Sequence, residues 1–424
     1  MKIAIIGAGW SGYAAAVEAT RLGHQVTVFE ASRTAGGRAR RVMATVAGQP
    51  AVLDNGQHIL IGAYVETLRL MKDVGVDPDL ALLRLPLALR FPDGAGLALP
   101  RWPAPLDAVA GILAARGWSW ADKLSLLRVA LGWRLAGFAC GPFESVKDLC
   151  RGLTPGAMAS LIDPLCVSAL NTPAERASGQ VFLRVMRDAL FAQSGGSNLL
   201  LPRVDLSALL PDAALAWLAA HGGRARLGVR VQAIAPAASG WSVDGEAFGA
   251  VLLACPSMEA ARLVESSGIA AGAWATEARA LPHEALTTVY LYAPQARLRE
   301  PMLALRSNAD EPAQFVFDRA RLGGPAGLLA FVVSASVGDG ETLTRQVLAQ
   351  AARQLGLDGL QPVRTIVEKR ATFACAPGLR RPAGRIAAGL FACGDYIAGP
   401  YPATLEGAVR SGLEAARELQ GFSI

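Results

Sequence analysis

A glycine-rich segment near the N-terminus restricts the fold of this chain more than any other feature of its sequence. Residues 2–6 (KIAII) form a short apolar run of the kind found in buried parallel strands, and the sequence GAGWSG follows at residues 7–12. A helical stretch extends to about Leu22, and residues 25–30 (QVTVFE) have the pattern of a second strand. This order of strand, turn, helix and strand predicts an α/β domain of the Rossmann type that binds a dinucleotide.

Each glycine of the turn has a separate physical role. We expect Gly7 to permit the tight turn, Gly9 to let a pyrophosphate approach the backbone, and Gly12 to let the helix pack closely on the strand. The free N–H groups at the start of the helix would face the phosphates, and Ser11 is expected to contact the cofactor there. Glu30 ends the second strand, where its carboxylate would accept hydrogen bonds from ribose hydroxyls and would disfavour a 2′-phosphate.

The ten residues after the second strand indicate which nucleotide is bound. They contain Gly36-Gly37-Arg38, which resembles the extended fingerprint of the amine oxidase and phytoene desaturase superfamily of flavoproteins. The resemblance implies FAD as the cofactor, with Gly37 letting the backbone pass close to it and Arg38 supporting its phosphates. A guanidinium suits that role because its fork can hold two oxygens at once.

A middle segment, residues 221–256, resembles another part of the superfamily site. It contains a Gly-Gly pair, a Val-x-x-Ile pattern and an apolar run that ends in proline. We interpret it as a pair of strands, around Val231 and at residues 250–256, with a hairpin-like stretch at 241–248 between them. The resemblance implies that a backbone group near Val231 contacts the adenine.

A C-terminal segment resembles the part of the site that holds the flavin. A strand ends in Gly394 and Asp395, and residues 401–412 open a helix. The resemblance implies that Asp395 bonds a ribityl hydroxyl and that the helix N-terminus, at Thr404 and Leu405, faces the flavin ring. A positive helix end there would stabilise the anionic form of reduced flavin.

Over essentially its whole length the chain resembles the hydroxysqualene dehydroxylases of hopanoid-making bacteria, also called squalene-associated FAD-dependent desaturases. Besides the nucleotide fingerprints, the resemblance lies in residues 53–60 (LDNGQHIL), 164–166, 169–173, 200–207 (LLPRVDLS), 287–291, 368–375 and 402–412. It implies reductive removal of water from 12-hydroxysqualene to give squalene, with reduced FAD as the hydride donor. An isoprenoid lipid would then be the substrate, and the protein would supply a long dry pocket and an acid for the leaving hydroxyl.

The candidate for that acid is His58. His58, in Gly56-Gln57-His58, follows a segment that superfamily members place beside the flavin ring, and Gly56 is expected to contact the cofactor. The pKa of a histidine lies near the working pH. The alternative is a histidine that bonds the backbone and packs against the flavin. Asp54 is interpreted as a ligand of the backbone or cofactor, and Tyr290 and Tyr401 either bond near the pocket or are half-buried core residues.

Composition narrows the choice of partners. Hydrophobic residues make up 52% of the chain, but no run of about 20 apolar residues predicts a membrane-spanning helix. The net charge is +6, without a long Lys/Arg run or aromatic–basic interleaving, so nucleic acid is not expected. Between Arg101 and Phe138, Leu and Ala spacing predicts helices that carry Trp102, Trp118, Trp120 and Trp133. These tryptophans suggest peripheral contact with lipid headgroups; the alternative is a helical cap with tryptophan in its core.

Cysteine and histidine usage bears on the compartment. The six cysteines form no CxxC pair and only four histidines are present, so neither a metal site nor a disulfide framework is expected. The first apolar residues belong to a strand, so no signal peptide is expected. We therefore expect a cytoplasmic protein, with peripheral contact at the inner face of the cytoplasmic membrane as a hypothesis.

The length of 424 residues favours two interleaved domains. The expected fold class is α/β, a Rossmann-like FAD-binding domain of the glutathione-reductase/amine-oxidase type with an inserted α+β substrate domain. The FAD-binding domain is expected at residues 1–61, 196–260 and 363–424. The substrate domain is expected at residues 62–195, mostly helical, and 261–362, with strands at Thr287–Tyr292, Phe315–Phe317 and Leu328–Ser334.

Three functions are compatible with the sequence. Besides reductive dehydroxylation, the same fold supports a carotenoid-type desaturase, in which hydride passes from hydrocarbon to flavin, and a non-enzymatic isoprenoid escort protein. The intact segments at Asp395 and Thr404 argue against the escort. No second GxGxxG marks a nicotinamide domain, so an external reductase and transient NAD(P)H binding both remain open as the electron donor.

Overall fold

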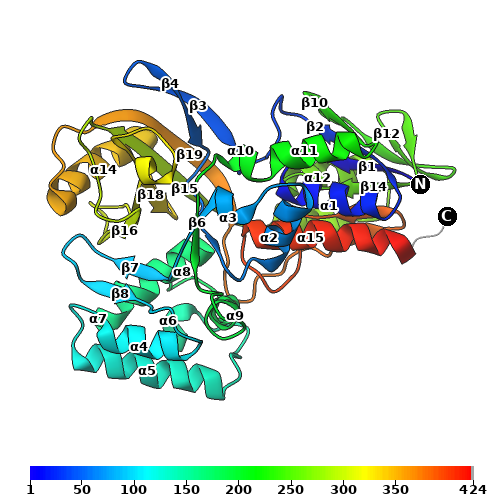
Figure 1. The fold of residues 1–424 in the computed structure, drawn as a ribbon. Coiled ribbons are helices and arrows are strands. Elements are labelled where there is room, and N and C mark those ends of the chain that lie inside the picture. The colour runs from blue at the N-terminus through cyan, green and yellow to red at the C-terminus, as the bar shows by residue number, and fades with distance from the viewer. Residues whose placement is uncertain (422–424) are drawn as a thin grey trace.

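The computed structural model describes residues 1–421, and its central element is a six-stranded sheet in the order β10-β2-β1-β14-β21-β20 (Figure 1). The strands are β1 (Lys2–Ile6), β2 (Gln25–Glu30), β10 (Arg224–Leu227), β14 (Ala250–Leu253), β20 (Arg385–Ala387) and β21 (Leu390–Ala392). All neighbours pair in parallel except β20, which is antiparallel at the edge. The molecule is α/β, as the glycine-rich turn predicts, and the sheet collects strands from three distant parts of the chain.

The helix predicted after the glycine-rich turn is α1 (Trp10–Arg21), and it packs against α15 (Leu405–Glu418). At Gly412 the two helices approach so closely that a Cβ would lie 2.2 Å from the carbonyl oxygen of Ser11. Only glycine permits that approach. The first and last α-helices of the chain are therefore held together beside the sheet.

The hairpin predicted in the middle segment is confirmed, but the strand expected before it is wrong. Strands β11 (Ile234–Ala237), β12 (Gly240–Val243) and β13 (Glu246–Phe248) form a small antiparallel sheet. Strand β10 ends earlier, at Leu227, because Gly228 adopts a φ of +75° and turns the backbone away. Residues 228–233, which include Val231, consequently form a loop rather than a strand.

A second, antiparallel sheet has the order β16-β17-β18-β15-β19. Its strands are β15 (His283–Tyr292), β16 (Met302–Ala304), β17 (Phe315–Asp318), β18 (Leu328–Ser334) and β19 (Gln361–Phe373), with α14 (Gly340–Leu355) packed on it. The three strands predicted here are confirmed. Strand β19 crosses the expected boundary at residue 363 and pairs with β15 along its length. The final residues of the expected 363–424 segment, 422–424, lie outside the described residues.

A helical lobe lies below the two sheets in Figure 1. Its elements are β7 (Ala88–Arg90), β8 (Gly96–Ala98), α4 (Leu106–Ala114), α5 (Trp120–Leu135), α6 (Val146–Leu149), α7 (Pro155–Ala157), η1 (Met158–Ile162), α8 (Asp163–Leu170) and α9 (Gly179–Leu190). The helices expected between Arg101 and Phe138 are thus confirmed. Trp118 is only 9% exposed and belongs to the core, so its expected contact with lipid is wrong, whereas Trp102 and Trp120 are exposed.

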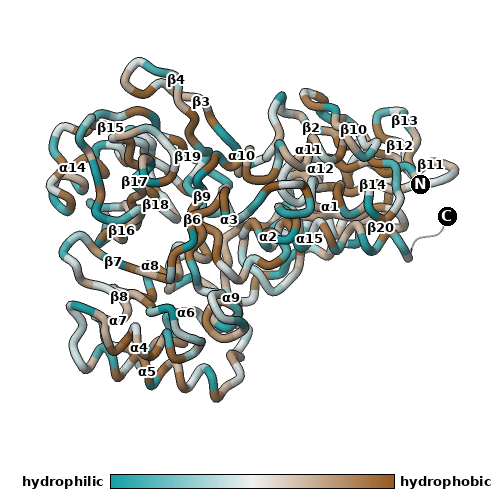
Figure 2. Tube along the Cα trace, in the orientation of Figure 1, coloured by the Kyte–Doolittle hydropathy of each residue, from teal (hydrophilic) through white to brown (hydrophobic). Residues whose placement is uncertain are grey.

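The remaining elements connect these parts. They are the hairpin β3 (Arg41–Val46) and β4 (Gln49–Asp54), the small sheet of β5 (Leu60–Ile61), β9 (Leu199–Pro202) and β6 (Leu82–Leu85), and the helices α2 (Val65–Asp73), α3 (Pro78–Ala81), α10 (Leu206–Leu209), α11 (Pro211–Ala220), α12 (Ser257–Ser266) and α13 (Gly272–Arg279). Figure 2 shows hydrophobic residues in the central strands and again along α4 and α5. Within residues 1–421, no helix combines the length and apolar character needed to cross a bilayer.

Candidate functional site

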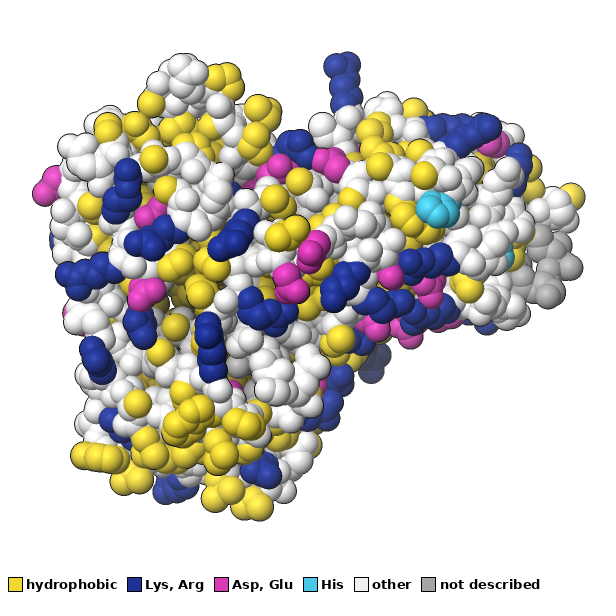
Figure 3. Space-filling model, viewed as in Figure 1, with side chains coloured by type: hydrophobic (Ala, Val, Ile, Leu, Met, Phe, Trp, Pro, Cys, Tyr) yellow, Lys and Arg dark blue, Asp and Glu magenta, His cyan; other side chains and the backbone are white. Residues whose placement is uncertain are grey.

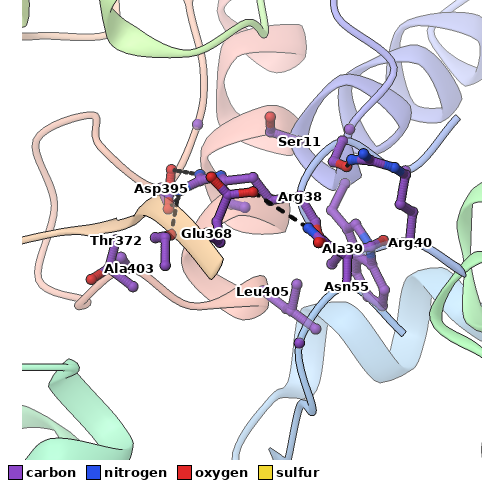
Figure 4. Close-up of a pocket in the computed structure, with 18 of the residues that line it drawn as sticks. Ser11, Arg38, Ala39, Arg40, Asn55, Glu368, Thr372, Asp395, Ala403 and Leu405 are labelled. Atoms are coloured by element: carbon purple, nitrogen blue, oxygen red, sulfur yellow. Dashed lines mark hydrogen bonds and ion pairs between the residues drawn. The ribbon is translucent and has the colours of Figure 1, made fainter. Parts of the chain in front are cut away.

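A cavity of about 700 Å³ lies at the carboxyl ends of the parallel strands. Its walls include Gly7 after β1, Glu30 at the end of β2, Ala254 after β14 and Asp395 after β21. Ligands of open α/β sheets bind at this edge, because successive strand-to-helix turns meet there. Figure 4 shows side chains from the N-terminal and C-terminal parts of the chain converging on it.

The structure brings the predicted site residues together in this one cavity, with a single exception. Its lining includes Gly7, Gly9, Ser11, Glu30, Gly37, Arg38, Gly56, His58, Val231, Gly394, Asp395, Thr404 and Leu405. Gly12 does not line it. A Cβ at Gly12 would lie 2.0 Å from the Gly7 carbonyl oxygen, which agrees with the close packing expected of the third glycine.

Gly9 is a glycine for a different reason. Its φ of −80° suits any residue, and the atom nearest to a Cβ at this position would be the Gly37 Cα, 3.9 Å away. The protein itself therefore leaves room for a methyl group here. The space that the missing Cβ keeps free opens on the cavity, where a phosphate can approach the backbone.

The start of α1 is suited to an anion. Its N-cap is Gly9, which offers no side chain to the first N–H groups, and the first turn contains no acidic residue. These N–H groups have no partner within the helix, and the helix dipole is positive at this end. A pyrophosphate satisfies both requirements, so the turn fits the dinucleotide that the sequence predicts.

The carboxylate of Glu30 is fixed by backbone donors at the end of β2. Its Oε2 accepts a hydrogen bond from the Ala8 N–H and its Oε1 accepts one from the Ser32 N–H, both at 2.8 Å. A carboxylate oxygen can accept more than one bond, so ribose hydroxyls still find acceptors here. Glu30 lies in the cavity wall where an adenosine ribose is expected.

Arg38 and Asp395 form an ion pair in the cavity wall. The Arg38 guanidinium donates to both oxygens of Asp395 at 2.7 Å and also donates to the Ala371 carbonyl. The neighbouring carboxylate raises the pKa of Arg38, so the guanidinium stays charged. The sequence predicted two independent ligands, one for phosphate and one for the ribityl chain, and the structure makes them partners.

Two further residues of this wall had not been predicted. Asn55 donates through Nδ2 to the Arg38 carbonyl at 2.8 Å and to Glu368 Oε2 at 3.4 Å, and both side chains line the cavity (Figure 4). Asn55 lies in the LDNGQHIL segment, which already pointed to this region. Glu368 is carried in by β19, and only the pairing of that strand with β15 places it here.

His58 lies where the nucleotide side of the cavity meets its apolar side. Its Nδ1 is 3.1 Å from the Gly56 carbonyl oxygen, which only accepts, so Nδ1 carries a proton and Nε2 is the free ring nitrogen. A Cβ at Gly56 would lie 3.5 Å from His58 Cε1 and 3.8 Å from a Leu286 methyl group. Burial lowers the pKa of His58, so the imidazole is mostly neutral at pH 7.

A buried polar cluster stands behind the cavity. Arg319 is 4% exposed, donates to Gln57 Oε1 at 2.9 Å and lies 3.5 Å from Asp54 Oδ2. The other oxygen of Asp54 accepts from the Leu206 N–H at 2.8 Å, which confirms Asp54 as a backbone ligand. Burial raises the pKa of Asp54 to about 6. Because a guanidinium cannot accept, Arg319 fixes the orientation of the Gln57 amide, and Gln57 lines the cavity.

The two tyrosines considered from the sequence lie outside the cavity. Tyr290 is fully buried, and its hydroxyl donates to the Asp54 carbonyl at 2.9 Å. The Tyr401 hydroxyl donates to Asp188 at 3.2 Å and accepts from Arg184 at 3.1 Å. Neither is among the residues that line this cavity, and Tyr401 instead lines a second cavity next to it, which shares Asp395.

A further part of the lining is apolar and comes mostly from the helical lobe and the second sheet. It includes Ile59, Val167, Ala169, Leu286, Phe315, Phe317 and Val332. Sequence reasoning had predicted strands at three of these positions without assigning them to a site. The cavity therefore joins a polar nucleotide half to an apolar half.

Comparison with known proteins identifies the family of this chain. The model of the flavin-containing amine oxidoreductase family matches residues 10–420. A hydroxysqualene dehydroxylase from Rhodopseudomonas palustris is 28% identical over an alignment of 449 positions, gaps included, which covers 97% of this chain and 96% of that protein. A zeta-carotene desaturase from Synechocystis is 38% identical over 82 residues, 19% of this chain and 16% of that protein. An oxidoreductase structure from Methanosarcina mazei superposes with a TM-score of 0.76 at 18% identity, covering 99% of this chain and all of that one.

Proposed function

The chain belongs to the family of flavin-containing amine oxidoreductases, and from that premise we propose that it removes the hydroxyl group of hydroxysqualene reductively to give squalene. It is an FAD-dependent oxidoreductase, and the residues that line its cavity suit FAD. The proposal concerns the substrate, an isoprenoid alcohol, and the direction in which hydride passes.

The observation that carries the proposal is how far each likeness extends. The likeness to a hydroxysqualene dehydroxylase covers 97% of the chain, whereas the likeness to a zeta-carotene desaturase covers 19%. A short match is expected wherever two flavoproteins share a nucleotide-binding segment. A match along the whole chain includes the helical lobe and the second sheet, which line the apolar half of the cavity and select a substrate.

Residues of this chain would hold FAD along the cavity wall. Glu30 would accept the adenosine ribose hydroxyls, the turn at Gly7 and Gly9 with the start of α1 would bind the pyrophosphate, and Asp395 would accept a ribityl hydroxyl. The N-terminus of α15, capped by Thr404, would face the flavin ring. When bound in its reduced form, FAD supplies a hydride to a carbon placed against the ring.

The reaction needs one proton at the leaving oxygen. The C–O bond breaks as the hydroxyl takes a proton and leaves as water, and a C–H bond forms with the hydride at the same carbon. His58 is the proposed proton donor, through Nε2, because Nδ1 is engaged by Gly56. Because its pKa is lowered, His58 carries the extra proton in only a fraction of the protein molecules at neutral pH.

The apolar half of the cavity suits the hydrocarbon. Phe315, Phe317 and Val332 come from the second sheet, and Val167 and Ala169 come from α8. Loss of an allylic hydroxyl leaves a delocalised cation, which water would otherwise capture. The apolar side chains would keep most water away from the cation until hydride arrives.

The proposal is tested by following hydrogen in heavy water. The FAD-loaded protein is reduced anaerobically in D₂O and given unlabelled hydroxysqualene, because the transferable hydride of reduced flavin exchanges with solvent. Squalene with one deuterium at the carbon that lost the hydroxyl supports the proposal, and the same run in ordinary water is the control. Unlabelled squalene would show that the hydride does not come from the flavin. If no squalene forms, hydroxysqualene is not the substrate.

A further inference from the structure

Helix α5 is apolar on two opposite sides. Its inner side packs into the core, where Leu126 is buried and Trp133 stands edge-on to Phe182 with ring centres 6.0 Å apart. Its outer side carries four exposed residues at helical spacing, Trp120, Leu124, Leu131 and Leu135, of which Leu135 is 80% exposed. Exposed apolar side chains that gather on one side of a helix are typical of a surface that binds a partner or a membrane.

The apolar surface continues onto α4 and the segment before it. Leu106, Val109 and Leu113 recur at helical spacing on α4 and are exposed, as is Trp102. We call these four residues and the four of α5 the α4–α5 face. Figure 3 shows hydrophobic side chains gathered over the lobe where Figure 1 places these helices, with basic side chains among and around them.

The charged residues around the α4–α5 face are mainly basic. The basic residues between positions 101 and 138 are Arg101, Arg116, Lys123, Arg128 and Arg134, and none of them forms an ion pair with any residue of 1–421. The two acidic residues of the same stretch have roles within the fold. Asp107 is buried, and Asp122 caps α5 through Ser119. The face therefore presents apolar side chains within a rim of net positive charge.

We propose that the α4–α5 face binds the surface of a lipid bilayer that contains anionic lipids. Apolar side chains enter the boundary between headgroups and acyl chains, tryptophans prefer that boundary, and the basic rim binds the lipid phosphates. A second copy of this chain fits less well, because two rims of the same sign repel each other. The inference goes beyond the proposed reaction, since binding to lipid requires no substrate.

The test is flotation of the FAD-loaded, full-length protein with vesicles of stated composition. Vesicles of phosphatidylcholine and phosphatidylglycerol (three to one) are expected to carry the protein at low salt, and binding is expected to fall as salt rises. Vesicles of phosphatidylcholine alone are expected to bind markedly less. Equal binding to both vesicles, or protein that stays at the bottom of the gradient with both, would overturn the proposal without bearing on the reaction.

Variants locate the contact. Leu124→Asp with Leu131→Asp places two charges on the outer side of α5 and is expected to weaken partitioning at least about tenfold. Arg101→Gln with Arg134→Gln is expected to weaken it about fivefold per charge removed. The control is Val337→Asp, an exposed apolar residue after β18, which should bind as the wild type does. Unchanged flotation of Leu124→Asp/Leu131→Asp would contradict the proposal.

Sedimentation of the same proteins without lipid tests whether a second copy of this chain covers the α4–α5 face instead. A wild type that dimerises through this face, with the dimer abolished by Leu124→Asp/Leu131→Asp, would assign it to a second copy and overturn the lipid assignment. A monomeric wild type that floats supports the lipid assignment. The wild-type comparison of two vesicle compositions holds even where a variant fails to fold.

Discussion

The guanidinium of Arg38 and the carboxylate of Asp395 lie 357 residues apart in the chain and are joined by two hydrogen bonds of 2.7 Å in the cavity wall. Arg38 follows the glycine-rich turn, and Asp395 follows the last parallel strand. Their pairing fastens the first and last parts of the site to each other. It also neutralises the Asp395 carboxylate in the wall of the cavity.

Arg38→Ala is therefore expected to weaken FAD binding about tenfold to a hundredfold, because it leaves the Asp395 carboxylate without its charged partner. Asp395→Asn is the matched control, since the amide oxygen still accepts from Arg38 and from a ribityl hydroxyl, and its effect should be smaller. Titration of the apoprotein with FAD, followed by flavin fluorescence, measures both. Equal FAD affinity of Arg38→Ala and wild type would show that the pair contributes nothing.

The two glycines of the turn are expected to respond differently to one methyl group. Gly9→Ala should leave the apoprotein within about 0.5 kcal/mol of wild type, because its backbone and surroundings accept a Cβ, but FAD affinity should fall about tenfold or more. Gly12→Ala should destabilise the apoprotein by about 1–3 kcal/mol, because the Cβ meets the Gly7 carbonyl. Urea unfolding and FAD titration separate the two effects. Normal FAD binding by Gly9→Ala would show that the phosphates do not lie against this turn.

Asp54 gives the stability of the protein a defined pH dependence. Burial raises its pKa to about 6, so between pH 4 and 6 the folded protein holds a proton that the unfolded chain releases. The stability of wild type relative to Asp54→Asn should fall as the pH rises through that window, by at most about 3 kcal/mol. Urea midpoints of both FAD-loaded proteins at pH 4, 5, 6 and 7 measure the difference. If the stability of wild type relative to Asp54→Asn instead rises with pH, the attraction between Arg319 and the Asp54 carboxylate outweighs the effect of burial.

His58 should be visible in the pH profile of turnover. A proton donor must be charged, so kcat/KM is expected to fall as pH rises, with a midpoint below 6.5 because burial lowers the pKa of His58. His58→Ala should lose this limb and slow turnover by about 10²–10⁴. His58→Gln keeps a donor to Gly56 and controls for packing. An unchanged profile in His58→Ala would assign the residue to packing against the flavin.

Local sequence patterns predicted the turns and strands whose formation depends on neighbouring residues. The turn at residues 7–12, the strands on either side of α1 and three strands of the second sheet (β15, β17 and β18) follow from glycine placement and apolar runs, so the fold class could be predicted. The register of distant segments could not. Nothing near Arg319 indicates that its guanidinium reaches Gln57, 262 residues earlier, because that contact exists only after two sheets have packed together.

The tryptophans show the same limit on a smaller scale. Trp118 and Trp120 are two residues apart, and composition treats them alike. Trp118 stands before the N-cap of α5 and turns into the core, whereas Trp120 opens the helix on its outer side. Which of them faces outward depends on the rotation of α5 against the lobe, and packing decides that rotation. Val231 differs from expectation for a related reason, since a positive φ at Gly228 ends its strand early.

The central claim is that reduced FAD in this protein converts an isoprenoid alcohol into a hydrocarbon, and one anaerobic single-turnover experiment tests it directly. The photoreduced, FAD-loaded protein is mixed with 12-hydroxysqualene, the flavin absorbance is followed, and the lipid is analysed by mass spectrometry. The account predicts that oxidised flavin returns and that one squalene forms for each flavin reoxidised. Bleaching of oxidised flavin by squalene or phytoene, with no turnover of the alcohol, would contradict it and identify a desaturase instead.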